Sequence, residues 1–190
     1  MNCSIIIRVK GTIMNEALKL ENYSYEDYLE IDKSTKERVE LIFGNIYMMA
    51  GASAYHQDIV GNIFFISKSI TKKSKKYIPK ITPFDIKLEI NGDISIVQPD
   101  IMLFYNNLKI PYAIFEVLSI QTAYKDMRIK KDLYEASGVK EYFLVNSNFK
   151  MIDRFVLVDN RYLYDRAYGV DDKMRVDCLD CDIDVVKIFE

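Results

Sequence analysis

Several residue types that define small protein scaffolds are scarce in this chain. It has three cysteines (Cys3, Cys178 and Cys181), too few for the disulfide framework of a small secreted protein. Cys178 and Cys181 have the spacing of half a zinc site, but a structural zinc site needs four ligands and the chain has a single histidine. We therefore expect two reduced cysteines near a C-terminal strand, and neither a zinc site nor a redox site.

Long apolar runs and an excess of basic charge are also lacking. No stretch of sequence approaches the roughly 20 apolar residues of a membrane span, and the apolar run at residues 4–8 is too short for a signal-peptide core. These features predict no membrane association and a cytoplasmic location. The formal net charge is −2 and the pI is about 5.6. Any nucleic acid must therefore be held by a local basic patch and not by the field of the whole molecule.

What is present is typical of one globular α/β domain: 190 residues, 49% of them hydrophobic and 28% charged. We expect an N-terminal extension over residues 1–24 and a single domain over 25–190. Apolar periodicity, turn residues and helix caps predict the following order of elements: a helix over 24–31, a hairpin over 40–49, a helix starting at Ser53 and ending in the polar run 72–76, strands over 84–90, 95–104 and 112–118, a helix over 122–136, a strand over 141–145 and a hairpin over 154–164. This order predicts a mixed central β-sheet flanked by helices, an α/β fold with some α+β character and extra hairpins.

Two carboxylates stand out in the predicted strands. A Gln-Pro-Asp motif ends at Asp100 inside the apolar run 95–104, and Glu116 lies inside the next apolar run, 112–118. A hairpin that pairs Asp100 with Glu116 would centre on Leu108, within a predicted turn. Two unpaired charges side by side in apolar surroundings would cost several kcal/mol. Because Mg²⁺ and Mn²⁺ prefer hard oxygen ligands, a divalent cation would remove that cost, and the motif predicts a metal-dependent active site.

The helix predicted after the Glu116 strand supplies positive charge. Asp126, Lys130 and Tyr134 are spaced four apart and therefore share one helix face, which can lie beside the strand ends. Lys130 could then direct its ammonium group at a scissile phosphate or at the attacking water. The alternative is a solvent-exposed ion pair between Asp126 and Lys130, worth a few tenths of a kcal/mol. Two neighbouring lysines compete for the same assignment: Lys125 and Lys131.

The order and spacing of these motifs resemble a known family. The relevant segments are Glu40-Leu-Ile-Phe-Gly44, His56, Gln98-Pro-Asp100, Phe115-Glu-Val-Leu-Ser119, Thr122, Asp126-x3-Lys130-x3-Tyr134 and Gly138-Val-Lys-Glu-Tyr-Phe-Leu-Val145. From about Tyr25 to the C-terminus, the chain resembles the Uma family of putative restriction endonucleases, in the PD-(D/E)XK nuclease superfamily. The resemblance implies a restriction-endonuclease-like core with a four-stranded mixed sheet.

The same resemblance implies a Mg²⁺ or Mn²⁺ ion held by Asp100, Glu116 and the carbonyl of Val117. In the superfamily the catalytic lysine normally stands two residues after the glutamate, where this chain has Leu118. The Uma pattern replaces it with a lysine on the following helix, which matches Lys130.

Two further residues take roles through the resemblance. Glu40 matches the first acidic position of the family, where it would bind a metal-associated water or a second metal, although an acid beside a turn is often a surface residue. His56 matches a histidine of the family pattern and would lie at the edge of the active site, although on its own it is a polar residue at a helix N-terminus. Asp85, another acid on a predicted core strand, could supplement the metal site or face solvent.

The sequence as a whole predicts a metal-dependent endonuclease that hydrolyses DNA phosphodiester bonds and, by analogy, forms a homodimer. DNA contacts would come from a lysine cluster that also suits the C-terminal end of a helix dipole: Lys72, Lys73, Lys75 and Lys76. Two other functions stay open. One is a protein without catalytic activity that keeps the fold for nucleic-acid binding or assembly, and the other is a metal-dependent phosphoesterase acting on a small substrate.

Overall fold

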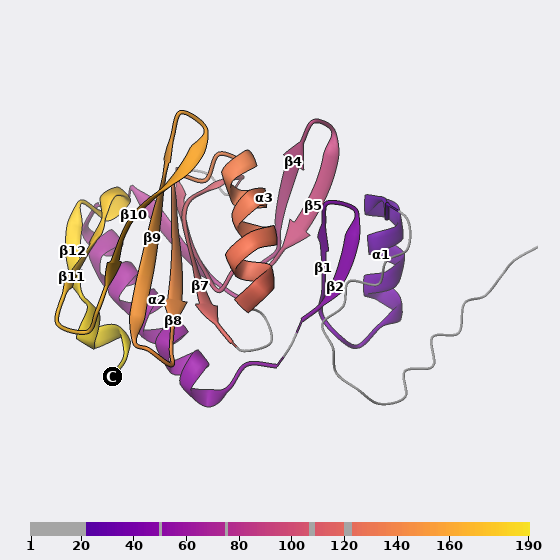
Figure 1. The fold of residues 1–190 in the computed structure, drawn as a ribbon. Coiled ribbons are helices and arrows are strands. Elements are labelled where there is room, and N and C mark those ends of the chain that lie inside the picture. The colour runs from indigo at the N-terminus through magenta and orange to yellow at the C-terminus, as the bar shows by residue number, and fades with distance from the viewer. Residues whose placement is uncertain (1–21, 50, 75, 107–108, 120–122) are drawn as a thin grey trace, which may run out of the picture.

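A six-stranded mixed sheet forms the centre of the computed structural model, which describes residues 22–49, 51–74, 76–106, 109–119 and 123–190 (Figure 1). The strand order is β10-β9-β8-β7-β6-β3. The strands are β3 (Tyr77–Ile81), β6 (Ile101–Tyr105), β7 (Pro111–Leu118), β8 (Glu141–Asn146), β9 (Met151–Val158) and β10 (Arg161–Tyr168). β7 and β8 pair in parallel, while the other neighbouring pairs are antiparallel. The predicted mixed α/β fold is confirmed.

Both faces of this sheet are covered, and strand β7 shows why. Its side chains alternate between the two faces, as the pleat of a strand requires. Ala113, Phe115 and Val117 pack in one core with helix α2 (Ala54–Ser74). Ile114 packs in the other core with helix α3 (Lys131–Ala136). Strands covered on both faces are expected to be apolar throughout, so the charged Glu116 within β7 is the exception that needs an explanation.

A second sheet, of four antiparallel strands, lies beside the first (Figure 1). Its order is β2-β1-β5-β4, formed by β1 (Val39–Ile42), β2 (Asn45–Met48), β4 (Ile86–Ile90) and β5 (Asp93–Val97). Helix α1 (Tyr25–Ser34) covers it through Tyr28. Ser24 caps α1, and the side chain of Asp27 accepts a hydrogen bond from the Ser24 N–H at 2.8 Å, which forms a capping box.

The C-terminal residues form a small hairpin on the α2 side of the main sheet. It consists of β11 (Lys173–Val176), the 3₁₀ turn η2 (Asp177–Leu179), β12 (Cys181–Asp184) and a last 3₁₀ turn η3 (Val185–Ile188). Met174, Val176 and Val185 are buried in the same core as α2. Cys178 and Cys181 are free thiols, as predicted from the low cysteine count. The sequence predicted one C-terminal strand, whereas the structure has two strands that form a hairpin.

The strand predicted over residues 95–104 is wrong in one respect, because the structure divides it at the Gln-Pro-Asp motif. Residues up to Val97 belong to β5 in the small sheet, and Ile101 begins β6 in the large sheet. Pro99 has no N–H to donate to a sheet ladder, which favours a break at this point. The chain therefore changes sheets at the motif, and this places Asp100 at a junction between the two sheets.

Strand β3 is a second departure from the prediction. Its residues, which include Pro79 and Lys80, lie between the predicted polar run 72–76 and the predicted strand over 84–90, where the sequence predicts no element. Proline is tolerated because β3 is the edge strand of the main sheet and pairs with β6 alone. The predicted extension over residues 1–24 lies almost entirely outside the described residues, as does Leu108, the predicted centre of the hairpin.

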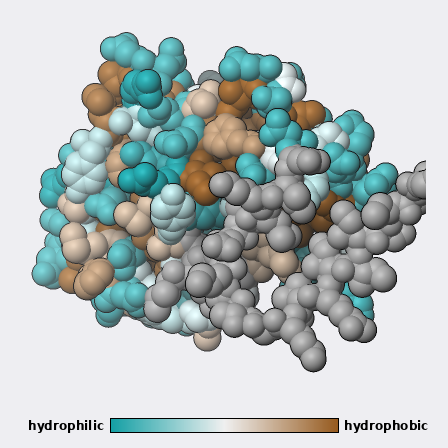
Figure 2. Space-filling view, turned by 45° about the vertical axis from the view of Figure 1, so that its right-hand side comes forward, coloured by the Kyte–Doolittle hydropathy of each residue, from teal (hydrophilic) through white to brown (hydrophobic). Residues whose placement is uncertain are grey.

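Among the described residues, no helix is both long enough and apolar enough to cross a membrane. Hydrophobic and hydrophilic residues are interspersed on the face of the molecule that Figure 2 shows. Large exposed hydrophobic side chains such as Phe65, Tyr124 and Phe149 come from separate elements of the fold. Such single exposed hydrophobic residues are normal for a globular protein.

Candidate active site

Asp100 and Glu116 lie beside one another, as the predicted register of the hairpin requires. Ile101 pairs with Phe115 across β6 and β7, so the position before β6 falls next to Glu116. The Asp100 N–H donates to Glu116 Oε2 at 3.3 Å, and the Val117 N–H donates to Asp100 Oδ2 at 2.8 Å. Each carboxylate thus accepts a hydrogen bond from a backbone N–H at or next to the other acidic residue. The Glu116 side chain is buried, with 3% exposure.

The N-terminus of helix α2 brings His56 to the same place. Ser53 starts the helix as predicted, because its hydroxyl oxygen accepts a 3.1 Å hydrogen bond from the His56 N–H. His56 Nε2 then lies 3.2 Å from Asp100 Oδ2. Burial lowers the pKa of His56, but hydrogen bonding to Asp100 and its charge outweigh burial, so the net shift is upward. His56 therefore holds Asp100 in position at the edge of the site.

Two lysines reach the site from a π-helical segment, η1 (Lys125–Lys130), which leads into α3. The predicted helix over 122–136 is therefore not α-helical throughout, and Thr122 lies outside the described residues. In an α-helix, residues five apart are offset by about 140°. Hydrogen bonds from i to i+5 in a π-helix instead stack such residues, and this brings Lys125 and Lys130 to the same side. π-helical turns are rare and are found mostly at functional sites.

Glu40, on strand β1, receives both ammonium groups. Lys125 Nζ lies 2.6 Å from Glu40 Oε2, and Lys130 Nζ lies 2.8 Å from Glu40 Oε1. The Gln98 N–H adds a 3.0 Å hydrogen bond to Glu40 Oε1. Burial raises the pKa of Glu40, but the charges of Lys130 and Lys125 outweigh burial and lower it to about 2. The Glu40 side chain is fully buried, so the alternative that Glu40 is a surface residue is wrong.

Glu116 and Glu40 both contact Lys130, but the pKa of Glu116 is raised whereas that of Glu40 is lowered. Its Oε1 accepts hydrogen bonds from Lys130 Nζ at 3.0 Å and from the Tyr134 hydroxyl at 2.8 Å. Burial raises the pKa of Glu116 to about 8 despite the nearby Lys130, and the charges of Asp126 and Asp100 add to this effect. Glu40 has a second cation and Glu116 does not, which explains why two carboxylates on one lysine differ so much.

Lys130 is the centre of this cluster and is itself 3% exposed. Burial lowers the pKa of Lys130, but the carboxylates of Glu116, Glu40 and Asp126 outweigh burial and raise it well above its usual value. Asp126 Oδ1 lies 3.8 Å from Lys130 Nζ, and both side chains are buried. The alternative of a solvent-exposed pair between Asp126 and Lys130 is therefore wrong.

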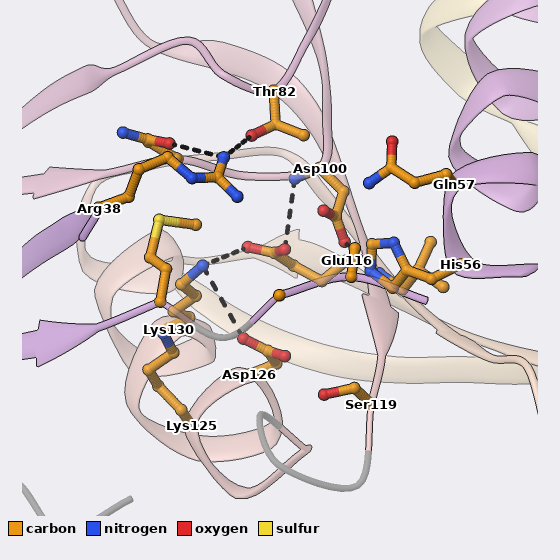
Figure 3. A pocket seen from close by; sticks show the side chains of 15 residues that line it. Arg38, His56, Gln57, Thr82, Asp100, Glu116, Ser119, Lys125, Asp126 and Lys130 are labelled. Carbon is orange, nitrogen blue, oxygen red and sulfur yellow. Dashed lines mark hydrogen bonds and ion pairs between the residues drawn. The ribbon is translucent and has the colours of Figure 1, made fainter. Parts of the chain in front are cut away.

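Most of these groups, but neither Glu40 nor Tyr134, line one pocket (Figure 3). Asp100, Glu116 and Lys130 lie in it, together with Lys125, Asp126, His56 and Val117. Polar side chains complete the lining: Arg38, Gln57, Thr82, Gln98 and Ser119. Asp85 is exposed, does not line the pocket and lies just before β4. Lys131 is also outside it, with its ammonium 4.3 Å from the ring centroid of Phe155.

The predicted DNA-binding lysines lie at the opposite end of α2 from the pocket. Sixteen residues separate His56 from Lys72, which corresponds to about 24 Å along an α-helix. Lys72 and Lys76 are exposed, Lys73 belongs to the last turn of α2, and Lys75 lies outside the described residues. Their role in DNA binding stays a prediction.

Sequence reasoning missed Arg38 and Thr82, and it did not choose between Lys125 and the other lysines. A signal for Arg38 existed, because residues two apart in a strand share a face and Glu40 was already a candidate. No sequence pattern indicates Thr82, which reaches the pocket through the fold. The pairing of Lys125 with Glu40 depends on the π-helical turn, which apolar periodicity does not reveal.

Comparisons with known proteins agree with this fold. A crystal structure titled as a putative nuclease belonging to DUF820, from Anabaena variabilis ATCC 29413, matches the chain with a TM-score of 0.70 and 15% sequence identity. The match covers 87% of this chain and 97% of that chain, and at this identity it shows a shared fold. No curated protein matches the chain.

A family model described as "Uma2: Putative restriction endonuclease" matches residues 25–184. This range contains the two sheets, α2, η1 and every pocket residue named above. The family and the fold together support a nuclease-type function. The chain belongs to the Uma2 family of putative restriction endonucleases.

Proposed function

We propose that this protein is a metal-dependent endonuclease that hydrolyses DNA phosphodiester bonds. The observation that carries the proposal is an excess of negative charge in one buried pocket. Three carboxylates line the pocket (Asp100, Glu116 and Asp126), and a fourth, the buried Glu40, pairs with its lysines. They outnumber the three cations of the lining: Arg38, Lys125 and Lys130. The raised pKa of Glu116, about 8, is a direct consequence of this imbalance and of burial.

The residues present fit a divalent cation. Their donors are carboxylate and carbonyl oxygens, which Mg²⁺ and Mn²⁺ prefer, and a charge of +2 would offset the excess of carboxylates. Asp100, Glu116 and the Val117 carbonyl would hold the ion. Among the described residues no three histidine, cysteine or acidic side chains are grouped as metal ligands. A site with two carboxylates therefore needs oxygen ligands from the backbone, water or substrate, as is usual for Mg²⁺.

Bound Mg²⁺ polarises a phosphoryl oxygen and lowers the pKa of a coordinated water. The residues of the chain supply the remaining functions. Lys130, whose pKa is raised well above its usual value, stays an ammonium group and stabilises the negative charge that develops on phosphate. Glu40 fixes both lysines through its two oxygens, and His56 and the Val117 N–H fix Asp100. Lys130 would thus replace the lysine that Leu118 cannot provide.

Titration calorimetry with Mg²⁺ and Mn²⁺ tests the metal site. We expect binding by the wild type and none by the double variant Asp100→Ala plus Glu116→Ala. The matched control is Glu89→Ala plus Asp93→Ala, which removes two exposed carboxylates from the β4–β5 hairpin and should bind metal as the wild type does.

A cleavage assay on plasmid DNA follows, in which Lys130→Ala should be inactive. Absence of metal binding by the wild type, both alone and with a non-cleavable duplex, would overturn the proposal and favour a non-catalytic nucleic-acid-binding protein. Metal binding without salt-dependent binding of DNA would favour a small-substrate phosphoesterase. Gel filtration at several concentrations tests the homodimer, which the nuclease analogy suggests because two sites can address two strands.

A further inference from the structure

Arg38 is the cation of the pocket that lacks a charged partner. Its guanidinium Nη1 lies 3.4 Å from Thr82 Oγ1 and 3.4 Å from Gln98 Oε1, which are both neutral acceptors. Within the described part of the chain, no carboxylate lies at ion-pair distance from it. Four of the five other arginines of that part pair with carboxylates: Arg154, Arg161, Arg166 and Arg175.

The fold orients this exposed arginine without giving it a carboxylate partner among the described residues. The Arg38 carbonyl accepts a 2.9 Å hydrogen bond from the Met49 N–H, so the backbone is fixed next to β1 and β2. Gln98 contacts Arg38 through its side chain and Glu40 through its N–H, which couples Arg38 to the buried cluster. A guanidinium group held by neutral partners keeps donors free for an anion, and its planar fork suits phosphate.

The position of Arg38 indicates which phosphate it would bind. Figure 3 shows Arg38 on one side of Asp100 and Glu116, with His56 and Gln57 on the other side. His56 and Gln57 belong to the first turn of α2, where the partial positive charge of the helix dipole is concentrated and where no acidic residue stands. Positive potential therefore flanks the acidic centre on two sides.

We propose that Arg38 binds the phosphate next to the scissile one, so that the pocket takes a polynucleotide strand and not an isolated phosphate ester. This inference rests on the proposed function, because it takes Asp100 and Glu116 as the place of the scissile phosphate. It assigns Arg38, with Thr82 and Gln98 as the residues that orient it, to a substrate subsite. Lys130 and the acidic residues act on the reacting phosphate, whereas Arg38 acts one nucleotide away.

The test compares two substrates. Bis(p-nitrophenyl) phosphate is a diester with no second phosphate, whereas DNA has one on each side of every scissile bond. For Arg38→Gln we expect kcat/KM on DNA to fall by at least about tenfold, the usual effect of losing one charge-assisted hydrogen bond. Hydrolysis of bis(p-nitrophenyl) phosphate should stay within about twofold of the wild type. Arg38→Lys should be intermediate, because it keeps the charge and loses the fork.

Direct binding gives a readout that does not depend on cleavage. In Ca²⁺, the anisotropy of a short labelled duplex should show weaker binding by Arg38→Gln, with a salt slope reduced by about 0.9, the value for one phosphate contact. Arg161→Gln is the matched control, since the Arg161 side chain is 80% exposed on β10, away from the pocket. This variant should hydrolyse both substrates as the wild type does and should show the same salt slope of DNA binding. Thermal unfolding checks that each variant is folded.

Each outcome decides between the inference and the proposed function. Equal losses on both substrates would mean that Arg38 acts on the reacting centre through Gln98 and Glu40, and the inference would be wrong. Unchanged DNA cleavage and unchanged binding by Arg38→Gln would also overturn it. If the wild type binds DNA but hydrolyses neither substrate, the proposed function fails while the binding assay still tests Arg38. A wild type that binds no duplex overturns the inference directly.

Discussion

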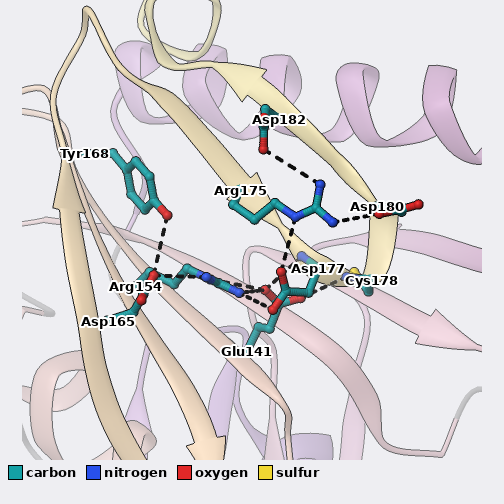
Figure 4. A network of polar contacts seen from close by, with 9 residues as sticks. All are labelled: Glu141, Arg154, Asp165, Tyr168, Arg175, Asp177, Cys178, Asp180 and Asp182. Atoms are coloured by element: carbon teal, nitrogen blue, oxygen red, sulfur yellow. Dashed lines mark hydrogen bonds and ion pairs between the residues drawn. The ribbon is translucent and has the colours of Figure 1, made fainter.

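Among the residues that the structure describes, buried charge forms two clusters, at opposite ends and on opposite faces of the six-stranded sheet. One surrounds Lys130 next to the end of β7. The other surrounds Arg154, where β8 begins (Figure 4). Glu116 pairs with Leu144 in the parallel ladder of β7 and β8, so Glu141 lies three residues earlier and faces the other side of the sheet.

The cluster at Arg154 is balanced where it is buried. Its buried members are one glutamate and one arginine, Glu141 at 1% exposure and Arg154 at 6%. Glu141 Oε1 accepts from Arg154 Nη2 at 2.7 Å and from the Asp177 N–H at 3.0 Å, and Oε2 accepts from the Cys178 N–H at 3.1 Å. The remaining acids, Asp165 and Asp177, are partly exposed to water. This pair fastens η2 and the C-terminal hairpin to the sheet.

The cluster at Lys130 has three buried carboxylates for one buried ammonium, and it lines a pocket. The difference shows that buried charge by itself does not mark a functional site. A structural cluster satisfies its own charges, because an unpaired buried charge costs several kcal/mol. A binding site keeps an imbalance that a ligand can remove, and access for that ligand.

The strongest test of this comparison is the same substitution in both clusters. Glu141→Gln should lower the free energy of unfolding by about 3 to 5 kcal/mol, because it leaves the Arg154 charge without its buried partner. Glu116→Gln should keep or raise the free energy of unfolding, because it removes an excess charge whose pKa is raised to about 8. Urea unfolding at pH 7 without divalent metal measures both. Similar losses in the two variants would contradict the comparison.

A pH series sharpens the comparison within the Lys130 cluster. The pKa of Glu40 is lowered to about 2, from 4.5. Its stabilisation is therefore fully present above its unfolded-state pKa and is lost as the pH falls toward 2. At pH 7, Glu40→Gln should lower the free energy of unfolding by about 3 kcal/mol, and this difference should shrink to less than half by about pH 3.

Urea unfolding of both proteins across this range of pH gives the measurement. Glu89→Gln, at an exposed position on β4, is the control and should differ little from the wild type at any pH. A Glu40→Gln effect that does not change with pH would show that Glu40 contributes through packing and not through its charge.

Local patterns were enough to predict much of this arrangement. The register of one short hairpin placed Asp100 beside Glu116, and Ser53 marked the start of the helix that carries His56. Spacing of four residues put Lys130 and Tyr134 on the face that meets Glu116. These predictions succeed because the contacts are close in sequence or pass through adjacent elements, where strand and helix periods constrain the geometry.

The rest depends on contacts between distant segments. Lys125 and Glu40 are 85 residues apart, and Arg38 and Gln98 are 60 apart. β5 and β6 pair with strands of different sheets, and those pairing partners are distant in sequence. The apolar run over 95–104 is compatible with either sheet and therefore does not indicate where the chain passes from one to the other. The π-helical segment at Lys125 was likewise not predictable, because helix periodicity in the sequence does not distinguish it from an α-helix.

The smallest expected difference concerns two tyrosines in the same core. Tyr134 donates to the Glu116 carboxylate at 2.8 Å, whereas Tyr162 donates to the Val139 carbonyl at 3.0 Å. Above pH 8, where Glu116 is ionised, Tyr134→Phe should lower the free energy of unfolding by about 1.5 to 3 kcal/mol and Tyr162→Phe by about 0.5 to 1.5 kcal/mol, since hydrogen bonds to charged groups are stronger.

Metal affinity separates the two tyrosines more clearly than stability does. Tyr134 holds a residue proposed to bind Mg²⁺, so its hydroxyl orients that carboxylate, and Tyr134→Phe should weaken Mg²⁺ binding by about tenfold. Tyr162 does not line the pocket and its hydroxyl donates to Val139, so Tyr162→Phe should bind Mg²⁺ as the wild type does. Calorimetry on both variants gives the answer. If both lost affinity equally, the effect would come from softening of the shared core, and Tyr134 would have no separate role at the site.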